Sequence, residues 1–179
     1  MSSYTDPSFV TSGDKLKSIL SKCKTCYKLT LKGSLILPIE SLGQVVLPKI
    51  HQKKFFIIIH LKSTDEQIGH WIAAACYLSQ RRCVIIDPSN KYRHSETCVQ
   101  KITQFCKTHN LTELNYATQF QGSKSFACGQ LVLAMCAKMH SHTLKQFLDL
   151  RKLIRSFTIS FNEHQMVLTM KRHFDTSIY

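Results

Sequence analysis

Three short stretches of the sequence hold residue types that together can cleave an acyl bond. They are residues 69–71 (GHW), 84–88 (VIIDP) and 121–129 (QGSKSFACG). They place His70 at the start of one expected strand, Asp87 at the end of its hairpin partner and Cys128 at the start of an apolar helix. We expect these three side chains to converge at one end of a sheet.

The cysteine stands where a thiol is readily made nucleophilic. Only the thiolate attacks a carbonyl carbon, and the aligned N–H groups and partial positive charge of a helix N-terminus favour that form. An adjacent imidazole can take the thiol proton and return it to the leaving amine, while a carboxylate fixes the imidazole tautomer. We therefore assign Cys128 as nucleophile, His70 as acid and base, and Asp87 as the orienting carboxylate.

The loop before Cys128 offers a donor for the negative charge that develops on the substrate oxygen. Gln121 carries a side-chain amide within loop reach of Cys128, and the Cys128 backbone N–H supplies a second donor. Each residue alone has an ordinary structural reading, because cysteine is among the most buried residue types and an Asp before Pro commonly begins a turn. The assignment depends on their joint order and spacing.

The same residues resemble a known family. A His-Trp pair, an acid at the end of a later strand and a Gln before Cys-Gly are similar to the papain-related cysteine peptidases. That group includes the SUMO-deconjugating enzymes and the adenain-like maturation proteases of adenoviruses. The stretches QGSKSFACG and CVIIDP resemble the adenain-like form most, and the likeness covers residues 69–129.

The resemblance implies an α+β fold with a central mixed sheet flanked by helices, and a catalytic set of His70, Asp87, Gln121 and Cys128. It also implies that Trp71 lines the substrate groove and that cleavage sites contain Gly. Adenain-like proteases often carry Glu where Asp87 stands, whereas Asp is usual elsewhere in the group. They are stimulated by DNA and by a disulfide-tethered peptide. No cysteine here matches the tether, so no peptide activator is assigned. DNA is kept as an activator to be tested.

The length of 179 residues suits a single cysteine peptidase domain over residues 1–179, with residues 1–13 as a loose polar arm. No apolar run reaches the ~20 residues of a membrane helix, and the N-terminus lacks the apolar region of a signal peptide. We therefore expect an intracellular monomer whose eight cysteines are reduced thiols. The resemblance adds the virion and the host nucleus as its location.

The chain is strongly basic, with 24 Lys and Arg against 11 acidic residues and a net charge of +13. Such an excess favours a polyanionic partner, most often nucleic acid. The candidate phosphate contacts near the N-terminus are Lys15, Lys17, Lys22 and Lys24. The alternative is that these lysines form a solvated face.

Two further cysteines, Cys23 and Cys26, have the spacing of half a zinc site. No second pair of ligands follows at a matching distance, so no metal site is assigned and their role stays open. The triad chemistry requires no cofactor.

Periodicity places the elements that must position these residues. We expect helices at 15–22, 95–109, 128–139, 143–154 and 163–173, and extended segments at 29–37, 54–60, 71–78, 82–87 and 114–120. Ser95 is the expected N-cap of the second helix. The last strand would place Gln119 on the same side of the chain as Gln121.

Three functions compete on this reading. The first is a viral maturation protease that cleaves precursor proteins. The second is a peptidase that deconjugates ubiquitin-like or SUMO modifiers, which shares the triad and the Gly-Gly chemistry. The third, of another class, is a basic DNA-binding packaging protein without catalysis, which would need no Cys-His-Asp-Gln set.

Overall fold

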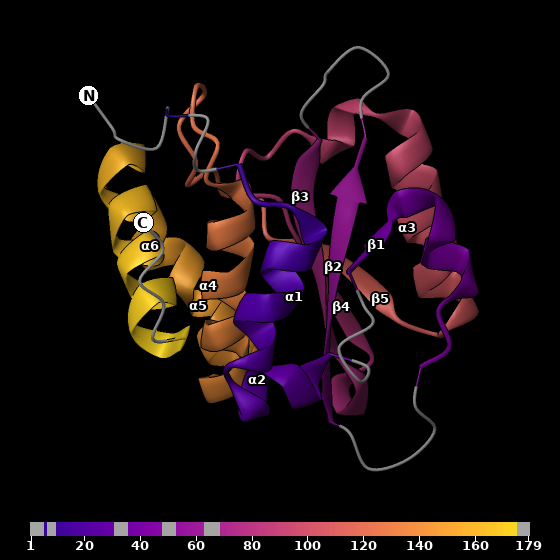
Figure 1. Cartoon of the computed structure of the whole chain (residues 1–179). Helices are drawn as coiled ribbons and strands as arrows, with labels where there is room; N and C mark the ends of the chain where they lie inside the picture. The colour runs from indigo at the N-terminus through magenta and orange to yellow at the C-terminus, as the bar shows by residue number, and fades with distance from the viewer. Residues whose placement is uncertain (1–5, 7–9, 31–35, 48–52, 63–68, 175–179) are drawn as a thin grey trace.

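The computed structural model describes residues 6, 10–30, 36–47, 53–62 and 69–174. A five-stranded mixed sheet lies between a thick layer of helices on one face and a thinner layer on the other (Figure 1). The architecture is therefore α+β, and the expected central mixed sheet with helices on both flanks is confirmed.

The strands lie in sequence order across the sheet. They are β1 (Ile36–Pro38), β2 (Lys54–Leu61), β3 (His70–Tyr77), β4 (Arg82–Ile86) and β5 (Thr112–Asn115). The pairs β2–β3 and β3–β4 are antiparallel, whereas β1 runs parallel to β2 and β5 runs parallel to β4. Because β3 and β4 form a hairpin, the start of β3 and the end of β4 lie side by side at the same end of the sheet. This brings His70 and Asp87 together.

The central strands are apolar on both faces, as expected for a sheet that is covered on both sides. Successive residues alternate between two cores. Phe56 and Ile58 of β2 face the core under the thick helical layer, whereas Phe55 and Ile57 face the other core. The alternation fixes the register of the sheet, since a slip of one residue would exchange the two faces.

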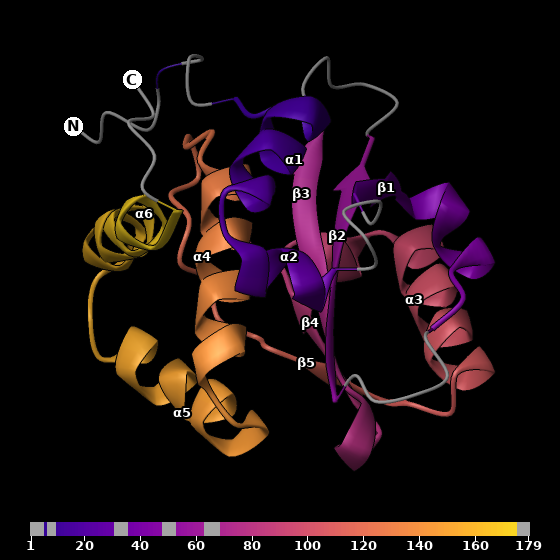
Figure 2. The same cartoon turned by 60° about the horizontal axis from the view of Figure 1, so that its bottom comes forward.

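One face of the sheet is covered by α1 (Gly13–Ser21), α2 (Lys24–Leu29), α4 (Cys128–Ser141), α5 (Leu144–Arg155) and α6 (Ile159–Phe174). The opposite face is covered by α3 (Glu96–Thr108) and the short 3-10 helix η3 (Ile39–Gln44), and Figure 2 shows α3 across the sheet from α4. Two further 3-10 turns, η4 (Leu78–Gln80) and η5 (Tyr92–His94), flank β4. Because α4 packs between the sheet and α6, it is buried on nearly every side, as its apolar sequence predicts.

Side chains satisfy the free backbone groups at the helix ends. Ser95 caps α3 as predicted, its hydroxyl accepting a hydrogen bond from the Cys98 N–H at 3.3 Å. At the other end of α4, Lys54 Nζ donates to the carbonyls of Met139 at 2.9 Å and His142 at 2.6 Å. Lys54 therefore compensates the negative end of α4 and ties it to β2.

Two sequence predictions differ from the structure. The extended segment expected at 29–37 begins as the end of α2 and ends in β1, and residues 31–35 lie outside the described residues. The strand expected at 114–120 stops at Asn115, so its second half was wrong. There the Asn115 side chain accepts a hydrogen bond from the Ala117 N–H at 3.0 Å, and Ala117 takes a positive φ of 50°. This local turn competes with the strand.

The end of the expected N-terminal arm is packed against the folded body. Thr11 is 3% exposed, and its carbonyl accepts a hydrogen bond from the Trp71 indole N–H at 2.8 Å. Residues 1–5 and 7–9 of the expected arm lie outside the described residues. Among the helices that the structure describes, none is long and apolar enough to cross a membrane.

Candidate active site

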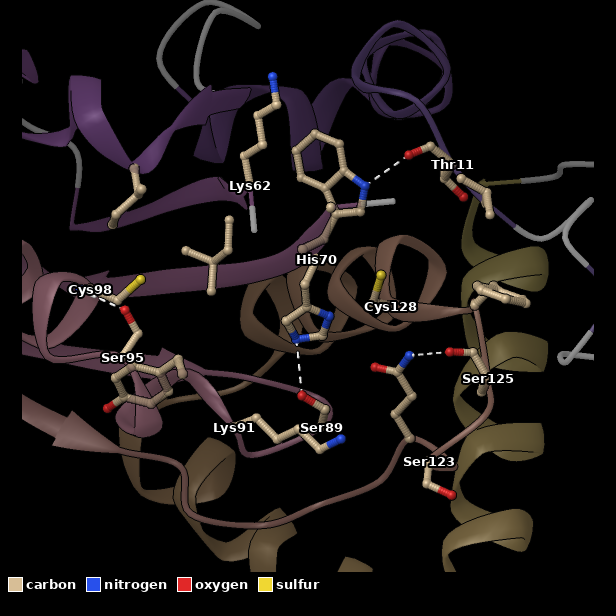
Figure 3. Close-up of a pocket in the computed structure, with 18 of the residues that line it drawn as sticks. Thr11, Lys62, His70, Ser89, Lys91, Ser95, Cys98, Ser123, Ser125 and Cys128 are labelled. Carbon is tan, nitrogen blue, oxygen red and sulfur yellow. Dashed lines mark hydrogen bonds between the residues drawn. The ribbon is translucent and has the colours of Figure 1, made fainter. Parts of the chain in front are cut away.

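A cavity of about 870 Å³ opens at the edge of the sheet where β3 begins and β4 ends. His70, Trp71, Gln121 and Cys128 all line it. Figure 3 shows His70 between Ser89 on one side of its ring and Cys128 on the other. The residues that the sequence selected for acyl-transfer chemistry therefore share one cavity, and Asp87 lies behind His70.

His70 and Asp87 form a short ion pair. The distance from His70 Nε2 to Asp87 Oδ1 is 2.6 Å, and the side chains are 23% and 1% exposed. Burial alone would lower the pKa of the His70 imidazole, but its interactions with Asp87 and with the Cys128 thiol raise that pKa to about 10. The imidazole is therefore held as a cation, and Nε2 is committed to the carboxylate.

Asp87 is fixed by the turn that follows β4. Its Oδ2 accepts hydrogen bonds from the backbone N–H groups of Lys91 and Tyr92, both at 2.6 Å. Its Oδ1 accepts from the Ser89 N–H at 2.9 Å and from the Ser89 hydroxyl at 2.8 Å. Burial raises the pKa of Asp87. The hydrogen bond and the charge of His70, together with hydrogen bonds from Ser89 and Tyr92, lower that pKa to about 2. The carboxylate is thus ionised and immobile.

Sequence reasoning missed the role of Ser89. Its hydroxyl oxygen is 3.1 Å from His70 Nε2 as well as 2.8 Å from Asp87 Oδ1, so Ser89 contacts both partners of the ion pair. The available signal was the run Asp87-Pro88-Ser89-Asn90, in which Asn90 adopts a positive φ of 57°. Such a run predicts a turn that folds back on its own carboxylate.

Cys128 is the first residue of α4, as the sequence predicted. Its backbone N–H lies in the first helical turn, where no carbonyl of the helix can accept from it. The next residue, Gly129, packs against Thr11: a Cβ at this position would lie 2.9 Å from Thr11 Cβ. A side chain at Gly129 would push the N-terminal segment away and disturb the start of α4.

Gln121 lies at the wall of the cavity and is 5% exposed. Its Nε2 donates to the Ser125 carbonyl at 2.7 Å, which fixes the orientation of the amide. Its Oε1 is buried and has no hydrogen-bond partner among the described residues. Because a primary amide carries two N–H donors, one can hold the loop while the second serves a substrate oxygen.

Glu163 of α6 supports this loop from behind, a role that sequence reasoning missed. The carboxyl is 1% exposed and hydrogen-bonds the Ser125 side chain and the Gly122 backbone. Burial raises its pKa despite those hydrogen bonds. The spacing of Glu163 from the buried Met166 and Val167 placed it on the apolar face of a helix, which was the signal for a buried acid.

Trp71 and Gln119 both line the cavity, and each also makes a structural contact of its own. Trp71 lines the cavity but is only 7% exposed, and its ring packs on His60 with centroids 4.5 Å apart. Gln119 lies in irregular backbone rather than in a strand, and its Nε2 donates to the Gln121 carbonyl at 3.0 Å. The strand expected at Gln119 was wrong, but Gln119 lines the same cavity as Gln121 and also helps to hold the loop.

The four candidate DNA-contacting lysines are exposed on the surface. They are Lys15 and Lys17 of α1, Lys22 after that helix and Lys24 at the start of α2. The cations that line the cavity are different ones, Lys62 and Lys91 (Figure 3). None of the four candidate lysines lines the cavity.

No protein-family model matches this chain, and a search of curated proteins finds no significant match. The function is therefore inferred from the geometry of the cavity and the residues that form it.

Proposed function

We propose that this protein is a cysteine endopeptidase with Cys128 as nucleophile. The observation that carries the proposal is the His70–Asp87 pair, 2.6 Å apart with its carboxylate buried, beside a cysteine that begins a buried helix at a cavity wall. A buried carboxylate costs stability unless it is paired, so a binding protein has no need to keep this pair at a cavity next to a thiol. Acyl transfer gives each member a task.

In the proposed reaction, the Cys128 thiolate attacks the scissile carbonyl carbon and the C–S bond forms. The carbonyl electron pair moves onto oxygen, where the second N–H of the Gln121 amide and the Cys128 backbone N–H stabilise it. The tetrahedral intermediate then expels the amine, which takes its proton from His70. The product is a thioester.

Water completes the cycle. His70, now neutral, takes a proton from a water molecule, and the hydroxide attacks the thioester carbonyl. Collapse of this second intermediate releases the carboxylic acid and regenerates the thiolate beside imidazolium. Throughout, Asp87 holds the ring orientation and stabilises the cation without accepting the proton itself.

For the substrate, we propose viral precursor proteins cut at Gly-containing sites. The support is the resemblance of residues 69–129 to adenain-like proteases, together with the net charge of +13, which suits a particle that holds nucleic acid. Removal of a ubiquitin-like or SUMO modifier is the competing reaction, since it uses the same triad.

One mass-spectrometric experiment separates these reactions. The protein is incubated with capsid precursor proteins and with modifier fusions, and new peptide termini are identified, with Cys128→Ala as the control. We expect new termini after Gly in the precursors and none with Cys128→Ala. Cleavage confined to the modifier junction would replace the substrate assignment, and no cleavage of any substrate would reject the endopeptidase.

We also propose DNA as the partner of the exposed lysines Lys15, Lys17, Lys22 and Lys24. Their exposure on neighbouring helices supports contacts with phosphates, and such binding weakens steeply as salt rises because counterions are released. Changing all four to Gln should reduce the salt slope of duplex binding by ~3–4 units. Fluorescence anisotropy at two salt concentrations measures this, and salt-insensitive binding would remove DNA from the account.

A further inference from the structure

A second cluster of cysteine and histidine lies outside the cavity. Cys23 precedes α2, Cys26 lies within it, and His173 lies near the end of α6. His173 Nε2 is 3.1 Å from Cys26 Sγ and 3.4 Å from Cys23 Sγ. All three ligand atoms lie within 4.8 Å of one another, and among the described residues no other group of three or more metal-ligating side chains meets this distance.

We propose that Cys23, Cys26 and His173 bind a zinc ion. Two thiolates and an imidazole are ligands that Zn²⁺ prefers, and the Cys-x2-Cys spacing is common in zinc sites. The third ligand comes from the far end of the chain, so sequence spacing alone could not reveal it.

The sulfur–nitrogen separations are close to those around a single tetrahedral ion. With Zn–S near 2.3 Å and Zn–N near 2.0 Å, ligand atoms around one tetrahedral ion lie ~3.5–3.8 Å apart. The two sulfur–nitrogen distances of 3.1 and 3.4 Å are slightly shorter. The two sulfurs lie within 4.8 Å of each other, so modest adjustments would bring all three ligand atoms to these separations. Cys23 is half-buried, so solvent can reach the fourth position.

A third thiol lies behind the cluster. Cys136 of α4 is fully buried, and its thiol contacts that of Cys26. A group that contacts a metal ligand fixes the orientation of that ligand, so Cys136 would support Cys26 from outside the metal shell.

A metal here would tie together elements that are distant in the sequence. The ion would join α2 to α6 across α4, the helix that begins with Cys128. A metal ion that binds only the folded state adds its binding free energy to the stability of the fold. Zinc would therefore stabilise the helical layer behind the active site. The proposal does not depend on the peptidase function.

Cobalt titration of the full-length protein tests this directly. The protein is reduced, stripped with a chelator and titrated with Co²⁺, which reports thiolate ligands by charge-transfer absorption, and then with Zn²⁺ as competitor. We expect one Co²⁺ per chain, thiolate absorption that Zn²⁺ abolishes, and a higher melting temperature with Zn²⁺. Absence of thiolate absorption in the folded wild type would overturn the proposal, as would a Cys23–Cys26 disulfide that forms while the protein takes up no metal.

Variants assign the ligands. His173→Ala and Cys23→Ala should each lose tight Co²⁺ binding, whereas His140→Ala is the matched control because its ring lies 6.4 Å from that of His173 without joining the cluster. Cys136→Ala should keep one ion per chain but bind it ~10–100-fold more weakly, as expected for a partner of a ligand. Unchanged Co²⁺ absorption in His173→Ala would also overturn the proposal.

Discussion

The described part of the molecule contains two Cys-His clusters built from the same residue types. In one, Cys128 stands beside His70, whose second nitrogen is bonded to Asp87. In the other, Cys26 stands beside His173, and the third member is a second thiol. The third member, Asp87 in one cluster and Cys23 in the other, distinguishes the chemistry that we propose for each.

A carboxylate behind the imidazole favours the cation, which can donate a proton to a leaving group. A second thiol instead completes a set of three ligands for the zinc ion that we propose. Access differs too, since Cys128 and His70 line the cavity of about 870 Å³ and Cys26 does not. The comparison predicts that each cluster can be disabled without disabling the other.

Changing one thiol in each cluster should give the largest contrast. Cys128→Ala should reduce peptide cleavage by ~10⁴-fold or more, because no acyl-enzyme can form. Cys26→Ala should abolish metal binding and leave cleavage by the folded protein largely intact. Steady-state kinetics with circular dichroism check both variants. Cys98→Ala is the control, because this thiol also lines the cavity. Substantial turnover by Cys128→Ala would end the distinction between the clusters.

Removing only the charge of Asp87, the third member of the cluster at the cavity, should have the next largest effect on cleavage. Asp87→Asn should lower kcat by ~10³–10⁴-fold with little change in KM, because the wrong imidazole tautomer becomes available. Glu113→Gln is the matched control, since the Glu113 carboxylate on β5 accepts a hydrogen bond from the Thr103 hydroxyl of α3 at 3.1 Å and does not hold His70. A normal rate for Asp87→Asn would move the orienting role to another residue.

Gln121→Ala should lower kcat by ~10²-fold at nearly unchanged KM, because an oxyanion donor acts mainly on the transition state. Gln119→Ala should have a smaller effect, since Gln119 acts through the Gln121 carbonyl. Gln104→Ala, on the exposed face of α3, should have none. If Gln119→Ala proves the more damaging change, the donor is misassigned.

Rising pH should remove activity by titrating His70. Its raised pKa of about 10 means that the imidazolium needed by the leaving amine is lost only above that pH, where kcat/KM should fall. Asp87→Asn removes a cause of the raised pKa and should move this limb to lower pH. A wild-type alkaline limb near 7 would contradict the ion pair.

The same shifts predict how stability depends on pH. The stability from His70 is complete below ~6.5 and is lost as pH rises through about 10, because its folded pKa is raised. The stability from Asp87, ~2 kcal/mol, is complete above ~4 and is lost as pH falls toward about 2, because its folded pKa is lowered. Urea unfolding across pH measures both.

Much of the fold could be predicted from local sequence. The short continuous apolar runs of β2 to β4 and the longer apolar run of α4 predict buried strands and a buried helix, and the structure has them there. The shortening of β5 could not be predicted from hydrophobicity, because it depends on a side-chain bond from Asn115 to the backbone of Ala117.

The candidate site shows the same division. His70, Asp87 and Cys128 could be placed together because a hairpin and a helix start fix their positions. Glu163 and His173 could not, because both lie on α6 and reach their partners only through tertiary packing of that helix. These two missed roles thus come from the element most distant along the chain, whereas the missed role of Ser89 lies in the local turn after β4.

The central claim, that His70 activates Cys128, is tested most directly by the rate at which this thiol is alkylated. Wild type and His70→Ala are treated with limiting iodoacetamide near neutral pH, and the adduct on the peptide that contains Cys128 is quantified by mass spectrometry. Because the thiolate is the reactive form, the account predicts that Cys128 reacts at least ~10-fold faster in wild type than in His70→Ala. Equal rates in the two folded proteins would contradict it.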